Sequence, residues 1–332
     1  MTGPGKMNWR YVIHLPGLVL ECGERLPFLD GEIVALSHDE WQAIDEVSPA
    51  PVDFADCKPA FFMGEKAGLR SSFMGPDSST IKFILERRQQ LYRAFVLSCG
   101  LYFLPDFKLS CTYVRGDWEE RGLLYFVGAS GRDWILTGQY RPGRHTLTPD
   151  MLAMAAAVLD DLAACEALLE PSGVEAALQS LAVASLPDAY ATINGESERL
   201  LPFLSAVSAM ENLLISQNGS AESITEQFAR GASVLVSQDK DCMERFLPKF
   251  RNIYRLRSEL LHSRRAANTL AADEIGLILL GTFLLPVGLR RIIAILASAN
   301  KLVDLPRYLA AAAVDAGLMD KIPPLVVPGA DE

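Results

Sequence analysis

The sequence predicts an α+β chain of two domains, with a mostly β or α+β domain over residues 1–147 and an all-α bundle over residues 148–332. The first observation is length, because a chain of 332 residues exceeds what one compact core usually holds. The second is a change of composition near residue 148. Glycine, proline and aromatic residues separate short apolar runs before this point, and segments rich in alanine and leucine follow it. The chain is therefore predicted to have a β-rich region followed by an α-helical region.

The N-terminal region contains apolar runs of strand length, each bounded by turn residues. These runs are RYVIHL, LVLEC, EIVALS, FKLSCTYV, GLLYFVG and WILTGQY. One helix is predicted among them over residues 78–100, because it begins with serine and threonine and its apolar residues recur with a period close to 3.6. We expect a sheet with one helix in this region.

The C-terminal region is predicted to be helical throughout. Thr148 is expected to cap its first helix, with Pro149 in the first helical position. Ser220 or Ser223 is expected to cap a further helix, and Glu226, three residues after Ser223, has the spacing of a capping box. Further helices are expected to begin at Pro171 and to cover residues 195–216, 220–237, 239–263, 271–301 and 305–319. Their short connections favour antiparallel neighbours in a bundle.

The most apolar segment, residues 275–289, is predicted to be a buried core helix. It is 15 residues long and contains Pro286, whereas a membrane span needs roughly 20 apolar residues. The N-terminus has no apolar stretch typical of a signal peptide. The six cysteines include no CxxC pair and are expected to be free thiols. These observations predict a cytoplasmic protein without a membrane partner.

Several classes of site have no support in the sequence. The four histidines are far apart, so we expect no metal site, and no glycine-rich cofactor loop occurs, so we expect no cofactor. A net charge of −10 argues against a general nucleic-acid binder. Residues 239–265, however, contain eight basic and four acidic residues and carry a local charge of +4.

One arginine in this basic segment is difficult to explain by solvation alone. On a helical wheel, with about 100° per residue, the apolar residues form one arc. They are Phe246, Phe250, Ile253, Leu256, Leu260 and Leu261. Arg257 falls inside this arc, and the positions four residues before and after it are apolar. Since burying an unpaired guanidinium is costly, its partner must come from another helix. His262 lies about 140° away around the helix.

Three segments together resemble the ApeA-like branch of the HEPN superfamily. YRLRSELLHS resembles the R-x(4–6)-H motif that HEPN domains carry near the end of a bundle helix. FLSAVSAMENLL (203–214) and EQFARGASVLV (226–236) resemble two further helices of this branch in order and spacing. The resemblance covers roughly residues 196–300. Ser263 stands where the branch often has glycine, and Ser258 where many HEPN nucleases have Asn or Asp.

The resemblance implies a homodimer in which two copies of the motif helix face each other and cleave RNA without a metal ion. Arg257 and His262 would be catalytic, and Glu211 would orient Arg257 through a bidentate pair. The residues expected to bind RNA are Arg230, Lys249, Arg251, Tyr254, Arg255 and Ser258, with Tyr254 stacking on an unpaired base. By analogy with defence proteins of similar order, residues 1–147 would be a sensor, and the function would lie in toxin or antiviral activity.

Two alternatives remain open at the level of sequence. In the first, the domain is a catalytically inactive HEPN module that binds RNA, a nucleotide or a protein partner. In the second, the helical domain is unrelated and the motif arises by chance. In that case Arg257 would form a salt bridge within one chain and His262 would face solvent.

Overall fold

The computed structural model describes twelve segments of the chain. These are residues 8–21, 25–35, 57–67, 71–72, 75–76, 78–103, 112–115, 125–126, 145–183, 200–216, 221–262 and 269–324. The chain forms two compact units, one of residues 1–92 and 104–156 and the other of residues 93–103 and 157–332. The divisions at 92/93 and 156/157 fall inside helices and the one at 103/104 falls at a helix end, whereas the sequence placed the domain boundary at 147/148. A β-containing N-terminal region followed by a helical region agrees with the predicted fold class.

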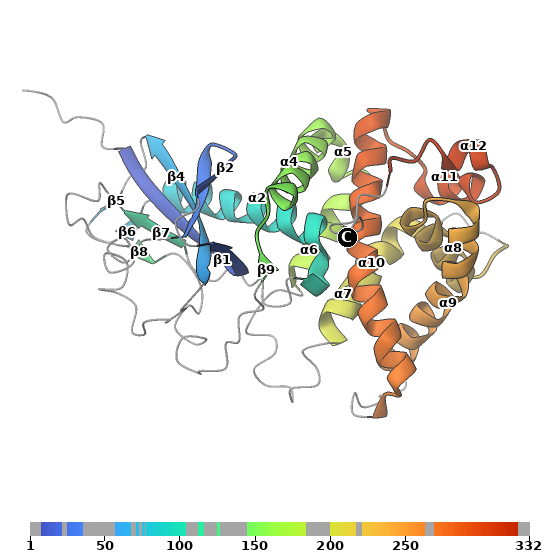
Figure 1. Ribbon diagram of the computed structural model, residues 1–332. Helices are drawn as coiled ribbons and strands as arrows, with labels where there is room; N and C mark the ends of the chain where they lie inside the picture. The colour runs from blue at the N-terminus through green and yellow to red at the C-terminus, as the bar shows by residue number, and fades with distance from the viewer. Residues whose placement is uncertain are drawn as a thin grey trace, which may run out of the picture. The chain divides into compact units, whose positions relative to one another are not determined.

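The first unit is built on a mixed sheet (Figure 1). Its strands follow the order β2-β3-β4-β1-β7-β8, and all of these neighbours are antiparallel. A seventh strand, β9, pairs with β1 in parallel. Their bounds are β1 (Asn8–Glu21), β2 (Arg25–Phe28), β3 (Gly31–Ala35), β4 (Cys57–Ala67), β7 (Thr112–Arg115), β8 (Tyr125–Phe126) and β9 (His145–Thr146). A separate pair consists of β5 (Ser71–Ser72) and β6 (Gly75–Pro76).

Strand β1 joins two runs that were predicted as separate strands. Its register against β4 shifts between Leu15 and Val19. Ile13 and Leu15 are buried before the shift, and Leu18 and Leu20 after it. Because side chains alternate along a strand, this irregularity transfers burial from odd to even positions while keeping one core face. The Pro-Gly pair at 16–17 therefore marks a bulge within one strand and does not end it.

The hairpin between β2 and β3 depends on one glycine. The turn contains Leu29 with a φ of 53°. Gly31 follows it and lies so close to β4 that a Cβ atom there would be 2.3 Å from the carbonyl oxygen of Met63. Only glycine fits at this approach without displacing the backbone.

Helix α2 (Ser78–Phe103) confirms the helix predicted near residue 78. Leu91, Ala94 and Phe95 on this helix are fully buried. The prediction of strands over FKLSCTYV and GLLYFVG is met in part by β7 and β8, whereas WILTGQY lies outside the described residues. Strand β4 was not predicted, because Pro59 and Gly64 interrupt its apolar pattern.

The second unit is helical, as predicted. Its helices are α4 (Pro149–Ala164), α5 (Glu166–Leu169), α6 (Val174–Val183), α7 (Leu200–Leu214), α8 (Ile224–Val236), α9 (Lys240–His262), α10 (Ala272–Ala299), α11 (Leu305–Ala312) and α12 (Ala316–Met319). Thr148 accepts a hydrogen bond from the backbone of Met151, and Ser223 accepts one from the backbone of Glu226, so both residues cap their helices. The capping box is met only in part, because the Glu226 carboxylate bonds Arg251. Helix α6 does not begin at Pro171 as predicted. The chain first turns through Gly173, whose φ is +82°.

Helix α10 lies at the centre of this unit and contacts α7, α8 and α9 (Figure 1). Two of its glycines permit close packing. A Cβ atom at Gly281 would lie 3.0 Å from Phe203, and one at Gly288 would lie 3.3 Å from Met210. The helix is long and apolar enough to cross a membrane by composition, but 72% of its most apolar 18-residue window is buried within the structure. The prediction of a buried core helix is confirmed.

Candidate functional site on helices α7 and α9

Helix α9 buries the face that the helical wheel predicted. Phe250, Ile253 and Leu256 are almost completely inaccessible to solvent. The Arg257 side chain, on the same face, is 17% exposed. At the far end of the arc, Leu261 is 48% exposed, so the buried face opens to solvent within the last turn. Arg257 therefore lies at the boundary between core and surface.

The partner of Arg257 comes from another helix, as predicted. Its Nη2 atom lies 2.5 Å from Oε2 of Glu211 on α7. The two residues are 46 positions apart in sequence. The pair ties α7 to α9 at the point where the apolar face of α9 meets solvent. A salt bridge within one chain is also what the unrelated-protein alternative predicts, so the pair alone does not separate the alternatives.

The predicted bidentate geometry is wrong, because Glu211 is shared between two donors. The Tyr254 hydroxyl donates to Oε1 of Glu211 at 2.6 Å. This leaves Oε2 alone for Arg257, which makes a single contact through Nη2. Nε of Arg257 is buried and has no hydrogen-bond partner among the described residues. Glu211, Tyr254 and Arg257 thus form one cluster with an unused donor.

Tyr254 is part of this cluster and is not an exposed platform for a base. Its side chain is buried, and its ring packs against Phe228 of α8 with centroids 4.9 Å apart. The Arg257 guanidinium carbon lies 5.8 Å from the centroid of the same ring. The prediction that Tyr254 stacks on RNA is therefore corrected, because protein already covers its ring. Its position three residues before Arg257 places both side chains on one helix face.

His262 is the last residue of α9 and is exposed. Among the described residues, no hydrogen bond or ion pair joins it to the Glu211 cluster. Ser258, one turn before it, is half-buried. Ser263, Arg264 and Arg265 lie outside the described residues. Within one chain, the structure brings Glu211 and Arg257 together and leaves His262 on the surface.

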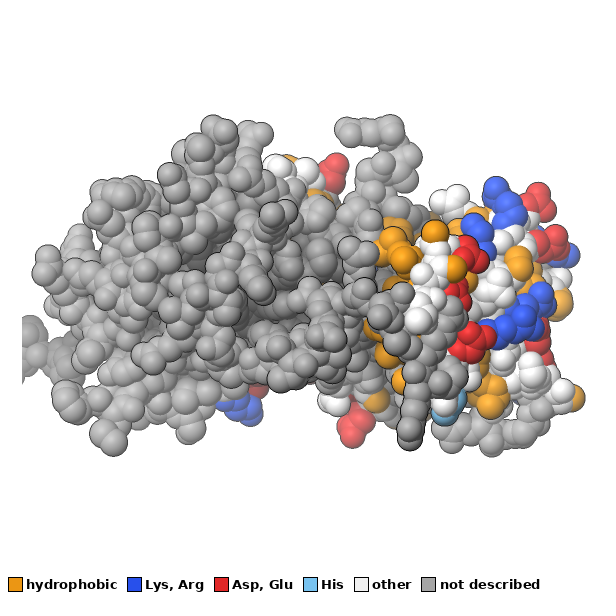
Figure 2. Space-filling model, turned by 90° about the horizontal axis from the view of Figure 1, so that it is seen from below, with side chains coloured by type: hydrophobic (Ala, Val, Ile, Leu, Met, Phe, Trp, Pro, Cys, Tyr) orange, Lys and Arg blue, Asp and Glu red, His pale blue; other side chains and the backbone are white. Residues whose placement is uncertain are grey.

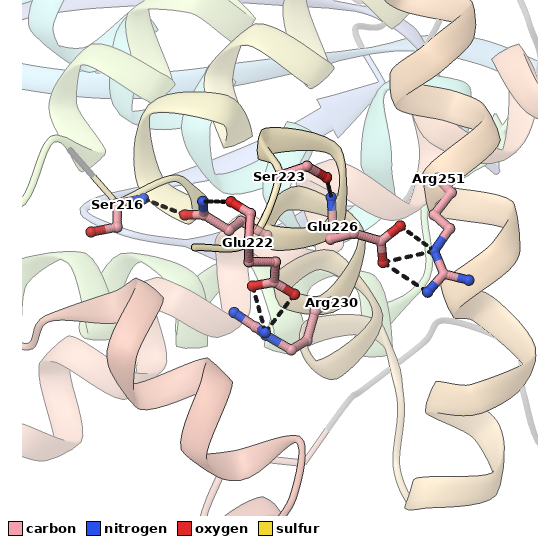
Figure 3. Close-up of polar contacts among 7 residues, drawn as sticks. Ser216, Glu222, Ser223, Glu226, Arg230 and Arg251 are labelled. Atoms are coloured by element: carbon pink, nitrogen blue, oxygen red, sulfur yellow. Dashed lines mark hydrogen bonds and ion pairs between the residues drawn. The ribbon is translucent and has the colours of Figure 1, made fainter. Parts of the chain in front are cut away.

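Two of the arginines predicted to bind RNA are neutralised by carboxylates of α8 and the turn before it (Figure 3). Arg251 bonds Glu226 through Nε, at 2.7 and 2.8 Å, and through Nη2 at 2.7 Å. This hydrogen bonding raises the pKa of Arg251. Arg230 bonds Glu222 at 2.6 Å. These pairs reduce the charge that Arg251 and Arg230 can offer to RNA, and RNA binding by these residues stays a prediction.

The other basic residues of α9 are more exposed. The Lys249 ammonium lies 5.2 Å from the centroid of the Phe246 ring, and Arg255 faces solvent. On the face shown in Figure 2, basic and acidic side chains lie next to each other over the helical unit. Because Arg251 and Arg257 pair with acids outside residues 239–265, the local excess of positive charge is smaller than the sequence indicated.

Sequence reasoning missed Gln227, which connects α7 to α8. Its side chain is 6% exposed. Its amide oxygen accepts from the backbone of Ser216 at 2.9 Å, and its amide nitrogen donates to the carbonyl of Glu222 at 2.9 Å. A neutral amide gives no charge pattern that could have identified it. Gln227 helps fix α7, which carries Glu211, against α8.

The Tyr254 hydroxyl gives the fold a specific alkaline pH dependence. Burial, and then the hydrogen bond to Glu211, raise the pKa of Tyr254 to about 12, from about 10 in an unfolded chain. The folded state therefore holds this proton more tightly, so the stabilisation is complete below about pH 10 and is lost as pH rises toward about 12. We expect the free energy of unfolding of the wild-type chain to fall more steeply across this window than that of Tyr254→Phe. Urea titrations at a series of alkaline pH values measure both slopes, and equal slopes would contradict the expectation.

Comparison of the chain with protein-family models, with curated proteins and with solved structures finds no match. Among the described residues, no group of three His, Cys, Asp or Glu side chains could hold a metal ion. The interpretation of the site therefore rests on its own geometry and on the motif resemblance.

Proposed function

We propose that this chain is a metal-independent endoribonuclease of the ApeA-like HEPN type, acting as a toxin or in antiviral defence. The observation that carries the proposal is the ion pair between Arg257 and Glu211, taken together with the motif resemblance around both residues. The resemblance to the ApeA-like branch implies that these two residues belong to one site. Glu211 holds the guanidinium near the surface of the helical unit, where a substrate phosphate can approach one of its remaining donors.

The proposed reaction is attack by the 2′-hydroxyl of RNA on the adjacent phosphate. The 2′-oxygen bonds to phosphorus and the 5′-oxygen leaves, so the products carry a 2′,3′-cyclic phosphate and a 5′-hydroxyl. His262 would accept the proton of the 2′-hydroxyl as a general base. Arg257 would stabilise the charge that develops on the phosphorane oxygens. The proton on the leaving oxygen would come from the conjugate acid of a histidine or from water.

A second copy of the chain is proposed to complete the site. His262 follows Arg257 by five residues, which on a regular helix is about 7.5 Å along the axis and about 140° around it. One helix therefore presents the two groups in different directions. Two antiparallel copies of α9 related by a twofold axis would bring Arg257 of one chain toward His262 of the other. The exposed Leu261 beside His262 is compatible with such a contact.

The test is cleavage of RNA by the purified full chain in the presence of a metal chelator. We expect wild-type protein to release fragments with 5′-hydroxyl ends and His262→Ala to be slower by at least about 100-fold. Asn252→Ala, an exposed substitution on the same helix, serves as the control and should cleave at the wild-type rate. Circular dichroism establishes that each variant is folded, and sedimentation gives the oligomeric state.

Two outcomes would reject the proposed activity. Cleavage by a folded His262→Ala protein at the wild-type rate would exclude His262 from the reaction. Tight RNA binding with no product at high protein concentration, with and without added metal, would favour the inactive binding module. The exposure of His262 and the carboxylates paired with Arg230 and Arg251 are the observations that favour this second candidate.

A further inference from the structure

Two arginines on helix α9 pair with glutamates in different ways. Glu226 closes on the side of Arg251 that carries Nε and Nη2, and both of these donors are used (Figure 3). Glu211 contacts only Nη2 of Arg257. Nε, on the same side of that guanidinium, is buried and has no partner among the described residues. The same helix thus carries two kinds of arginine–glutamate pair. We call the Arg251 pair a closed fork, because Nε and Nη2 both bond the carboxylate, and the Arg257 pair an open fork, because only Nη2 does.

The difference lies in the second oxygen of each glutamate. A side-on fork needs both carboxylate oxygens, one for Nε and one for Nη2. Both oxygens of Glu226 face Arg251. In Glu211, Oε1 instead accepts the Tyr254 hydroxyl at 2.6 Å. Tyr254 therefore competes with Nε of Arg257 for the same oxygen.

Several features favour the Tyr254 hydroxyl over Nε of Arg257 as the donor to Oε1 of Glu211. Its ring is buried and packs against Phe228, so the hydroxyl is held at a fixed position. The Tyr254 hydroxyl is protonated and able to donate at physiological pH, and burial and Glu211 raise its pKa further, to about 12. Leaving Nε of Arg257 buried without a partner costs free energy. A geometry that keeps such a donor open has a physical cause, and the Tyr254 hydroxyl supplies it.

We infer that Tyr254 is a positioning residue: its hydroxyl holds Glu211 in a one-sided contact with Arg257, leaves Nε of Arg257 without a carboxylate partner, and so sets the orientation in which the guanidinium meets an anionic substrate group. The catalytic part of this inference rests on the proposed function, in which Arg257 meets a phosphate. The positioning part concerns only the contacts within the chain and can be tested without RNA.

The test is Tyr254→Phe in the full chain, which removes the hydroxyl and keeps the ring. Glu211 is then expected to close on Arg257 as Glu226 does on Arg251. Nuclear magnetic resonance of arginine side chains detects this change, because the Nε proton resonance moves downfield when a carboxylate accepts it. In the wild-type chain we expect this downfield position for Arg251 and not for Arg257. In Tyr254→Phe we expect it for both. Arg257→Lys identifies the Arg257 signal.

The activity readout separates positioning from a structural role. We expect Tyr254→Phe to lower kcat by about tenfold, with a smaller effect on KM, since Arg257 acts on charge that develops in the transition state. The midpoint of thermal unfolding should be unchanged or higher, because a closed fork satisfies Nε. Tyr308→Phe, a half-buried tyrosine of α11, is the matched control and should change neither quantity.

The outcomes distinguish this inference from the proposed function. A downfield shift of the Arg257 signal in Tyr254→Phe supports positioning, even if the wild-type chain cleaves no RNA. An unchanged Arg257 signal in a folded Tyr254→Phe protein overturns the inference whatever the activity. If Tyr254→Phe does not fold, the wild-type spectrum decides alone, because a downfield Arg257 signal equal to that of Arg251 overturns an open fork.

Discussion

Replacing Arg291 with methionine is expected to lower the free energy of unfolding of the helical unit by about 3–5 kcal/mol. Arg291 is a core residue of α10 and is only 4% exposed. Among the described residues, no carboxylate forms an ion pair with it. Burial lowers its pKa to about 10, so the guanidinium keeps its charge at neutral pH. A buried cation without an acid partner needs another source of compensation.

Backbone carbonyl groups at two places provide that compensation. Nη1 of Arg291 donates to Ser237 at 2.5 Å, Leu235 at 3.1 Å and Val234 at 3.4 Å. These carbonyls belong to the end of α8, where the helix dipole is negative and carbonyls lack partners within the helix. Nε donates to the carbonyl of Pro323 at 2.6 Å, which holds the start of the C-terminal tail. Methionine fills similar volume but donates to none of these carbonyl groups, and among the described residues only Val234 keeps another donor, the backbone N–H of Ser237.

The measurement exploits the distribution of tryptophans. All four lie at positions 9, 41, 118 and 134, within the first unit. Far-ultraviolet circular dichroism in urea therefore follows mainly the helices, and tryptophan fluorescence follows the first unit. We expect Arg291→Met to shift the helical transition and to leave the fluorescence transition in place. The control Arg307→Met, on the exposed side of α11, should cost less than about 0.5 kcal/mol. A similar loss in both variants would contradict the role given to Arg291.

The helical unit was more predictable from sequence than the site within it. A helical wheel identified the buried face of α9, because periodic apolar residues and the geometry of the helix suffice for that. The need of Arg257 for a partner followed from the cost of burying a charge. The identity of that partner came from the motif resemblance. Its geometry could not be predicted, because sharing of Glu211 with Tyr254 depends on how α7 approaches α9.

The local charge pattern of the sequence overestimated the unpaired positive charge where an ion pair forms between two helices. Arg251 was counted in the basic segment, but its partner, Glu226, lies on α8, 25 positions away in sequence. A local count of charges omits partners that are distant in sequence. The burial of Arg291 was not predicted for a related reason, because a basic residue that follows an apolar run has the pattern of an exposed end of a buried segment. Its partners are carbonyl groups, which no residue pattern reveals.

Replacing Glu211 with alanine has the second large expected effect, because one carboxylate serves two buried donors. We expect a loss of about 2–3 kcal/mol in the helical transition, less than for a fully buried pair because Glu211 is 24% and Arg257 17% exposed. Glu226→Ala breaks a more exposed pair, in which both side chains are about a third exposed, and is expected to cost less than about 1 kcal/mol. Asn212→Ala, next to Glu211 on the exposed side of α7, controls for helix propensity.

A double-mutant cycle separates the pairing of Glu211 from its burial. Glu211→Ala leaves both the Arg257 charge and the Tyr254 hydroxyl without an acceptor, whereas Arg257→Leu removes the charge that most needs one. If pairing dominates, the double variant should recover about 1–2 kcal/mol relative to the sum of the single losses. Glu211→Gln should fall between wild type and Glu211→Ala, since its amide oxygen can still accept from Tyr254. Additive losses in the cycle would mean that the pair with Arg257 contributes nothing to the effect of Glu211→Ala, which would then come from packing and from the Tyr254 hydrogen bond. Arg257 would in that case not depend on Glu211 for its position. Because the proposed reaction needs Arg257 held in place, such additivity would weaken the assignment of Glu211 to the site as well as the account of the fold.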